Sequence, residues 1–317
     1  MNRKEFKKSC RNSVNLLLAY SFVTYAIVMV SLIVHVIWEY IKGTNIDRLM
    51  EDDAYWERIE AGGIEYLLIV FIGVLMIAIF RKSAGSWKTM FQSKKVMNKV
   101  SFVKLFFVFM MPQFLGLILD FCGEGILNYF GYTMEMSVES AFATSESIGM
   151  LLYAGIIGPV AEELWFRGVI LKNALPYGKR FAIIASSVLF GVFHANIPQA
   201  IFATMVGLIL AYVAVEYSIF WSIALHIFNN LIMGDGVGFL ISGLEVKTQD
   251  LICNLLMLVF FVVGILILLH DKKEIKEYFK ENPKGQGKHY LWYFTMAGTL
   301  IFIITNFVVS LLGISKL

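Results

Sequence analysis

The chain has 317 residues, a hydrophobic share of 58% and a mean hydropathy of +0.70, which is more apolar than a soluble domain. Its net charge is only +3, and no lysine and arginine cluster is interleaved with aromatic residues, so the composition argues against nucleic-acid binding. The scattered cysteines Cys10, Cys122 and Cys253 suggest neither a disulfide framework nor a thiolate metal site. We therefore expect an integral membrane protein whose solvent is the lipid bilayer.

Hydrophobic runs follow one another along the chain, and a spanning helix needs about 20 apolar residues. The pattern predicts an all-α polytopic transmembrane helix bundle of about 8–9 spans. The runs occupy residues 14–38, 64–80, 102–121, 148–171, 181–196, 199–217, 218–234, 251–269 and 290–313. The links at 197–198 and 216–219 are short, so the sequence does not decide between eight and nine spans. No internal repeat or linker divides the sequence, so residues 1–317 are expected to form a single membrane domain.

The charges of the loops predict an orientation. Residues 81–99, between the second and third runs, carry lysine and arginine but no acid, which predicts a cytoplasmic loop. The loops after the first and third runs are acidic and are expected outside. Counting spans from these loops gives a cytoplasmic N-terminus, and the long first run without a small-residue cleavage site predicts a retained span.

Ionisable residues inside the apolar runs are the functional candidates, because a charge in mid-bilayer is costly and normally faces a protein or water interior. The fourth run contains the pattern EExxxR, formed by Glu162, Glu163 and Arg167. Glu163 and Arg167 are four residues apart on one helix face, a spacing that permits an ion pair. Glu162 is turned by about 100° from Glu163 and is predicted to be the freer carboxylate.

Two further runs each present a polar stripe. Phe190 and His194 in the fifth run, and His226 and Asn230 in the seventh, are four residues apart and project from one side of their helix. At 1.5 Å per residue, Glu162, His194 and His226 lie about 15, 20 and 12 Å from the expected cytoplasmic ends of their helices. These depths fall within a hydrocarbon core of about 30 Å, so we expect the three helices to share one buried site.

The residue types suit hydrolysis of a peptide bond. Glu162 would take a proton from water as general base, and His194 would share in holding that water. His226 and Asn230 would donate N–H groups to the oxyanion that forms on the scissile carbonyl. A divalent metal such as zinc is another way to activate water, because Glu and His are ordinary zinc ligands. The sequence leaves the choice between a metal and no metal open.

Each candidate also has a structural interpretation. Glu163 and Arg167 would either brace the catalytic helix or form an ion pair that never touches substrate. Glu162 could be a buried neutral acid, and the two histidines could be interhelical hydrogen-bonding groups. Ser222 lies four residues before His226, but the third orienting group of a catalytic triad is missing from the pattern.

The ordered trio EExxxR, FxxxH and HxxxN on successive spans resembles the CPBP intramembrane proteases, which include the type II CAAX prenyl endopeptidases and the bacterial Abi proteins. The resemblance covers about residues 148–233 and implies an intramembrane endopeptidase of about eight helices acting on a membrane-associated peptide or protein, with the bacterial cell membrane as its expected location. Its matching catalytic positions are Glu162, Glu163, Arg167, His194, His226 and Asn230. The family has been regarded both as metalloproteases and as glutamate-dependent enzymes without a catalytic metal, so the resemblance leaves the same choice open.

Two other classes of function compete with a protease. Chains of Glu and His also act as proton relays, but a proton-coupled transporter predicts paired broken helices, and Gly158-Pro159 has no counterpart in the second half of the sequence. A non-catalytic immunity or scaffold protein would keep the polar stripes for helix packing. The sequence contains neither HExxH nor GxSxG, which argues against a zincin or a serine hydrolase.

Overall fold

The computed structural model describes residues 3–52, 55–56, 59, 62–80, 91–92, 95–142, 145, 147–283 and 287–317. The longer helices are α1 (Arg3–Ile41), α4 (Ile64–Ile79), α7 (Lys99–Met110), α8 (Pro112–Tyr129), α13 (Lys179–Phe193), α14 (Ile197–Glu216), α15 (Ile219–Ile227), α17 (Val246–His270) and α20 (Ala297–Leu311). The shorter helices are α2 (Ile46–Met50), α9 (Glu135–Phe142), α10 (Ile148–Leu152), α11 (Gly158–Glu163), α12 (Lys172–Ala174), α16 (Val237–Ile241), α18 (Lys272–Glu281) and α19 (Gly287–Phe294).

Several helices are continued by segments with a wider or tighter turn. The wider, π-helical segments are η1 (Tyr153–Ile157), η2 (Leu164–Leu171) and η4 (Phe228–Gly236), and η3 (Leu175–Tyr177) is a 3-10 turn. The strand pair β1 (Tyr132–Thr133) and β2 (Ser315–Lys316) is antiparallel and ties the C-terminal end of the chain to the end of α8. The predicted all-α polytopic bundle is confirmed.

The helices of the described residues overlap all the hydrophobic runs of the sequence. Six helical stretches are long and apolar enough to cross a membrane: Lys4–Ile41, Lys99–Tyr129, Ile148–Tyr177, Ile197–Glu216, Ile219–Ile241 and Val246–His270. The pair α19 and α20, bent by 65°, makes a seventh span if the two helices cross together. The helices α4 and α13 have 16 and 15 residues, and their shortness explains the difference from the expected 8–9 spans.

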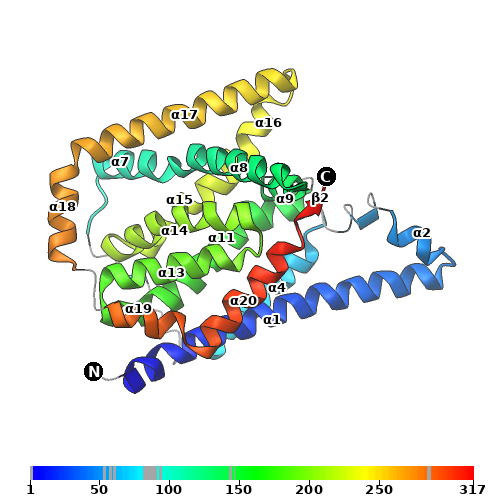
Figure 1. The fold of residues 1–317 in the computed structure, drawn as a ribbon, viewed down its shortest axis with the longest axis horizontal. Coiled ribbons are helices and arrows are strands. Elements are labelled where there is room, and N and C mark those ends of the chain that lie inside the picture. Colours follow the sequence, from blue (N-terminus) through cyan, green and yellow to red (C-terminus); the bar gives the residue numbers. More distant parts are fainter. Residues whose placement is uncertain are drawn as a thin grey trace.

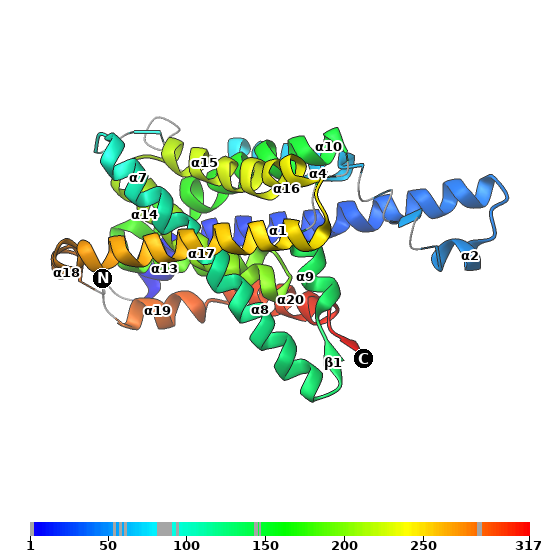
Figure 2. The same ribbon diagram turned by 90° about the horizontal axis from the view of Figure 1, so that it is seen from above.

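The helices are arranged in layers around α13 and α14. Figure 1 shows α11, α13 and α14 in the middle, with α7, α8 and α17 along one side and α1 and α20 along the other. Helix α7 packs on α17, and α1 packs on α20. The second half of α1 and the short α2 project away from the bundle in both ribbon views (Figures 1 and 2). The middle layer therefore carries the candidate site, and the outer layers enclose it.

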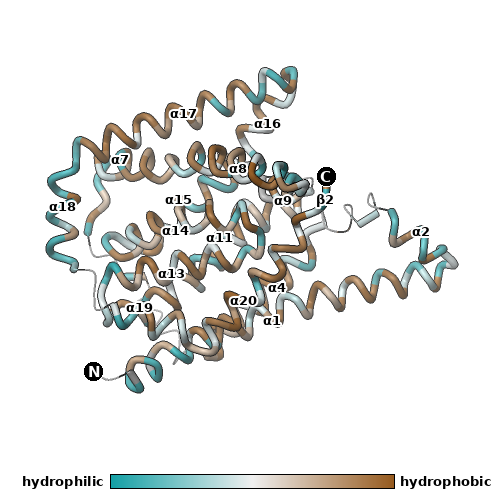
Figure 3. Tube along the Cα trace, viewed as in Figure 1, coloured by the Kyte–Doolittle hydropathy of each residue, from teal (hydrophilic) through white to brown (hydrophobic). Residues whose placement is uncertain are grey.

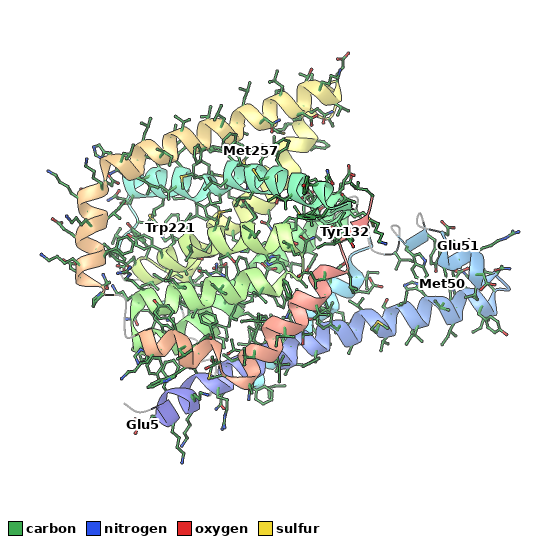
Figure 4. The ribbon with its side chains drawn as sticks, viewed as in Figure 1. Glu5, Met50, Glu51, Tyr132, Trp221 and Met257 are labelled. Carbon is green, nitrogen blue, oxygen red and sulfur yellow. The ribbon has the colours of Figure 1, made fainter. Side chains whose placement is uncertain are left out.

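Large apolar side chains fill the bundle and also cover its outside. The main buried cluster includes Trp165, Phe166, Phe181 and Phe190 from the middle layer. The outer helices are hydrophobic over most of their length, whereas α18 is mainly hydrophilic (Figure 3). Leu255 and Leu266 of α17 are more than half exposed, and Figure 4 shows side chains along the outer edge of this helix. An apolar exterior of this kind belongs in lipid, and the protein is an integral membrane protein.

The predicted orientation stays a prediction. Most of the basic loop on which it depends, residues 81–90 and 93–94, lies outside the described residues, as does part of the acidic loop after the first run. The expected cytoplasmic N-terminus therefore belongs with the proposals below.

Candidate active site

The two glutamates lie on a short helix between two widened turns. Helix α11 begins at Gly158 with Pro159 in its first turn and ends at Glu163, where η2 begins. The segment η1 precedes it directly. π-helical turns are rare and occur frequently at functional sites. Because α11 packs against α15, it presents Glu162 and Glu163 to the helix that carries His226.

Glu163 is completely buried and has a partner for each of its oxygens. Its Oε2 lies 3.2 Å from Nε of Arg167 and accepts a short hydrogen bond from the Ser222 hydroxyl. Its Oε1 lies 3.1 Å from Nδ1 of His226. The exposed fraction of both the Glu163 and the Arg167 side chain is 0%, so the two opposite charges compensate each other in a dry interior.

Arg167 is fixed by further contacts. Its Nη2 donates to the carbonyl of Gly207 at 3.3 Å. Its guanidinium lies over the ring of Phe190, 4.4 Å from the ring centre, in a cation–π arrangement. The same ring meets the imidazoles of His194 and His226 edge-on, at 5.0 and 5.7 Å between ring centres. The phenylalanine of FxxxH thus packs between the arginine of the first motif and the histidines of the other two.

Glu162 is the more accessible of the two carboxylates. The exposed fraction of its side chain is 21%, and its Oε2 lies 3.6 Å from Nε2 of His226. It is also close enough to Tyr20, Tyr153 and His194 for its charge to act on each of them. The two glutamates therefore contact the same His226 ring, Glu162 at Nε2 and Glu163 at Nδ1. The sequence predicted different surroundings for them, but it did not predict a shared histidine, because that contact depends on how α11 packs on α15.

His194 lies where α13 ends. Its Nδ1 is 2.9 Å from the carbonyl of Phe190, and because a carbonyl only accepts, Nδ1 carries the proton and Nε2 is the acceptor nitrogen. The next residue, Ala195, has a positive φ of 49°, and Asn196 then caps α14 by accepting from the backbone N–H of Gln199. This tight turn holds the ring of His194 at the edge of the site.

Asn230 belongs to a separate set of polar contacts. Its Nδ2 donates to the carbonyl of Ala154 at 3.0 Å, and its Oδ1 accepts from Nδ2 of Asn229 at 3.0 Å. Gln113 of α8 in turn donates to Oδ1 of Asn229 at 2.7 Å. This series of bonds, from Gln113 through Asn229 and Asn230 to Ala154, is called the amide chain below.

The structure thus brings some predicted residues together and keeps others apart. Glu162, Glu163, Arg167 and His226 form one contact network. His194 joins it through Phe190 and the charge of Glu162, whereas the amide of Asn230 is bonded within the amide chain.

Sequence reasoning missed three polar residues beside this site. Ser222 was considered only as a nucleophile, although its position four residues before His226 places both on the face of α15 toward α11. Gln113 and Asn229 are uncharged, so a search for charges within the membrane passes over them.

The donor groups do not fit a three-ligand zinc site in this arrangement. Among the described residues, no three His, Cys, Asp or Glu side chains converge as metal ligands. Both nitrogens of His226 face carboxylates, and Glu163 is bound by Arg167 and Ser222. A catalytic zinc normally takes three protein ligands and keeps a fourth position open. No step proposed below passes through a metal.

Comparisons with known proteins point to the same segment of the chain. Residues 144–232, which include all the motif residues, match the family described as "Type II CAAX prenyl endopeptidase Rce1-like". The "Putative membrane peptidase YdiL" of Bacillus subtilis (strain 168) is 30% identical over 116 residues, which cover 34% of this chain and 46% of that protein. The match thus spans about half the length of this curated relative. No solved structure matches the chain.

Proposed function

We propose that the protein is a membrane protease that hydrolyses a peptide bond of a membrane-associated peptide or protein. The match of residues 144–232, which contain the three motifs, to a family of CAAX prenyl endopeptidases supports this proposal. One observation carries the proposal. The partly accessible carboxylate of Glu162 lies 3.6 Å from an imidazole nitrogen of His226, whose other nitrogen is held by the buried Glu163. A base in contact with a fixed histidine, inside the bilayer, is suited to activating water.

Glu162 acts as the general base in this mechanism. It takes a proton from a water molecule while the water oxygen attacks the scissile carbonyl carbon. The acceptor nitrogen of His194 helps to hold that water. The protonated Glu162 then gives its proton to the leaving nitrogen as the carbon–nitrogen bond breaks, so that a carboxylic acid and an amine result and the glutamate is regenerated.

Asn230 and His226 stabilise the negative charge on the carbonyl oxygen. Asn230 uses one Nδ2 hydrogen for Ala154 and keeps the other for the substrate oxygen. Nδ1 of His226 faces Glu163 and its Nε2 faces Glu162. In the proposed mechanism the ring carries a proton on Nε2, on the side where the substrate carbonyl binds. Once Glu162 has taken a proton, it accepts less strongly from that N–H, which is then free to donate to the oxyanion.

Glu163, Arg167 and Ser222 serve to position the network. The carboxylate of Glu163 fixes the plane and the protonation of the His226 ring, and Arg167 compensates its charge. We place the protein in the bacterial cell membrane with a cytoplasmic N-terminus, as the loop charges and the bacterial relative suggest.

The test is cleavage by purified protein in liposomes that contain a library of membrane-associated peptides, with product ends read by mass spectrometry. Glu162→Gln should lower the cleavage rate by a factor of about 10³, within the usual range for a general base. The thermal unfolding of the variant should match that of the wild type, because Glu162 is partly exposed and keeps its shape as glutamine.

Asp120→Asn is the matched control, since Asp120 is also a largely buried carboxylate in a membrane helix, on α8. It should cleave at the wild-type rate. Equal cleavage by Glu162→Gln would overturn the assignment of the base. Solute flux without any cleavage would favour a transporter, and loss of activity on chelation with recovery on metal addition would show that a metal takes part.

A further inference from the structure

The amide chain links three membrane helices, and one of them, α8, carries none of the three motifs. Gln113 lies in the first turn of α8, directly after Pro112, where the long apolar stretch Lys99–Tyr129 is interrupted. Asn229 and Asn230 lie in η4, and Ala154 lies in η1. The exposed fraction of Asn229 is only 8%, so these amides pair in a mainly apolar setting, where an unpaired polar group is expensive.

The donor direction of the whole chain follows from its last member. The backbone carbonyl of Ala154 can only accept, so the amide of Asn230 must turn Nδ2 toward it. Oδ1 of Asn230 then faces Asn229, which donates to it, and Oδ1 of Asn229 faces the amino group of Gln113. Each amide donates to the next. Flipping any one of them would place an oxygen against another oxygen, or an amino group against another amino group.

The close packing of η1 on η4 brings the last two members together. A Cβ placed on Gly155 would lie 2.9 Å from Cδ1 of Leu231 and 3.5 Å from its Cα, so only glycine allows this approach. Ala154 directly precedes Gly155 in the chain, and Asn230 directly precedes Leu231. The carbonyl that sets the donor direction is therefore held by the backbone packing.

We infer that Gln113 and Asn229 are positioning residues for Asn230, and that the amide chain holds the second Nδ2 hydrogen of Asn230 toward the substrate carbonyl. This inference rests on the proposed function. An inverted Asn230 would present its own oxygen to the oxyanion, which would repel the charge that Nδ2 stabilises. The effect is therefore on the reaction step, where charge develops, and hardly on the binding of the neutral substrate.

Gln113→Met tests the inference, because methionine keeps the length of the side chain and removes the donor. It leaves Oδ1 of Asn229 unpaired, so Asn229 can turn, and Oδ1 of Asn230 then loses the donor that holds it in place. We expect kcat to fall about tenfold with little change in KM, against about 10² for Asn230→Ala. In the Asn230→Ala background, Gln113→Met should cause no further fall in kcat, because the group that it positions is already gone.

Asn306→Leu is the matched control. Asn306 is a buried membrane amide with the same kinds of bond, donating to the carbonyl of Phe302 at 2.7 Å and accepting from the Tyr25 hydroxyl at 2.8 Å, but it lies on α20, outside the amide chain. Its loss should lower the melting temperature and leave kcat and KM unchanged.

The outcomes separate this inference from the proposed function. An unchanged kcat for Gln113→Met, or an equal fall in both backgrounds, overturns the positioning role. If the wild-type protein cleaves nothing, the proposed function fails instead, and with it the role of Asn230 toward substrate. The amide chain itself is then tested by the melting temperatures of Gln113→Met, Asn230→Ala and the double variant. If the two decreases in melting temperature simply add in the double variant, the two residues are not linked.

Discussion

The helical stretch Ile148–Tyr177, which carries the two glutamates, is less hydrophobic than the outer helix α17 but more deeply buried. In its most apolar part, Ile148–Tyr177 has a mean hydropathy of 1.3 and 39% of its residues are buried. The corresponding part of α17 has a mean hydropathy of 3.1, and only 11% of its residues are buried. The most hydrophobic of the six spans thus lies on the outside, and one of the two least hydrophobic spans lies in the middle of the bundle.

This difference follows from the solvent. Lipid is as apolar as a leucine side chain, so burial inside a membrane protein gains packing and polar contacts and no hydrophobic transfer energy. Glu163, Arg167 and His226 can be satisfied only inside the bundle, whereas Leu255 and Leu266 on α17 are satisfied by lipid. A span of low hydropathy in a membrane protein therefore indicates where the polar chemistry lies.

Breaking the buried charge pair should have the largest effect. Arg167→Met leaves Glu163 buried without its cation, and removal of one partner of a buried ion pair typically costs about 3–5 kcal/mol. We expect the free energy of unfolding in detergent to fall by about this amount. Chemical denaturation followed by circular dichroism measures it.

The double variant Glu163→Gln, Arg167→Met is the control for this effect. It removes both charges, so it should recover a large part of the stability that Arg167→Met loses, while peptide cleavage stays low because His226 loses its carboxylate partner. A double variant as unstable as Arg167→Met would mean that the pair acts through packing and not through charge.

The next largest effect is expected at a buried leucine of the middle layer, and an exposed leucine of the outer helix α17 serves for comparison. Leu189 on α13 is fully buried, and Leu266 on α17 is 59% exposed. Leu189→Ala creates a cavity and should lower the free energy of unfolding by about 2–3 kcal/mol. Leu266→Ala exchanges one lipid-facing surface for another and should change it by less than about 0.5 kcal/mol. Similar losses at both sites, measured by the same denaturation, would show that α17 is covered by protein and not by lipid.

The sequence predicted much of this architecture because the bilayer imposes simple rules. Long apolar runs become helices, so the run 251–269 coincides with α17. The spacing of Glu163 and Arg167 within one helix was sufficient to foresee their ion pair, since helix geometry alone brings them together. Predictions of this kind depend only on neighbours along the chain.

The sequence predicted that the helices of the three motifs share a site, but it could not predict the individual contacts between them. The approach of Glu162 and Glu163 to one His226 ring depends on the packing of α11 on α15, and the bond from Gln113 to Asn229 joins residues 116 positions apart. The π-helical segments beside α11 have no composition that distinguishes them from an ordinary helix. The assignment of catalytic roles therefore stays a prediction until variants are assayed.

Gly191 allows the closest approach within the middle layer. A Cβ at this position would lie 2.0 Å from Oγ1 of Thr204 and 2.3 Å from the carbonyl oxygen of Ala200. Gly191→Ala must therefore push α13 away from α14, which should cost about 1–3 kcal/mol of unfolding free energy and displace His194, three residues further on. We expect a lower cleavage rate as well as a lower melting temperature.

Thr204→Ala provides the control for Gly191→Ala. It removes the nearest side-chain atom but leaves the backbone contact with Ala200, so the double variant should recover only part of the lost stability. Full recovery would place the whole clash on the threonine side chain, and an unaffected Gly191→Ala would mean that the two helices are not in close contact here.

The smallest effect concerns the turn that ends α13 beside the site. Ala195 has a φ of 49°, a left-handed conformation that a residue with a Cβ adopts only at a cost of about 1–2 kcal/mol. Ala195→Gly removes this cost but adds flexibility to the unfolded chain, worth about 0.4–1 kcal/mol in the opposite direction. The net expectation is a gain in stability of about 0.5 kcal/mol at an unchanged cleavage rate. Ala214→Gly, in the last turn of α14, should instead lose up to about 1 kcal/mol, and equal losses at the two alanines would show that the turn after His194 is not left-handed.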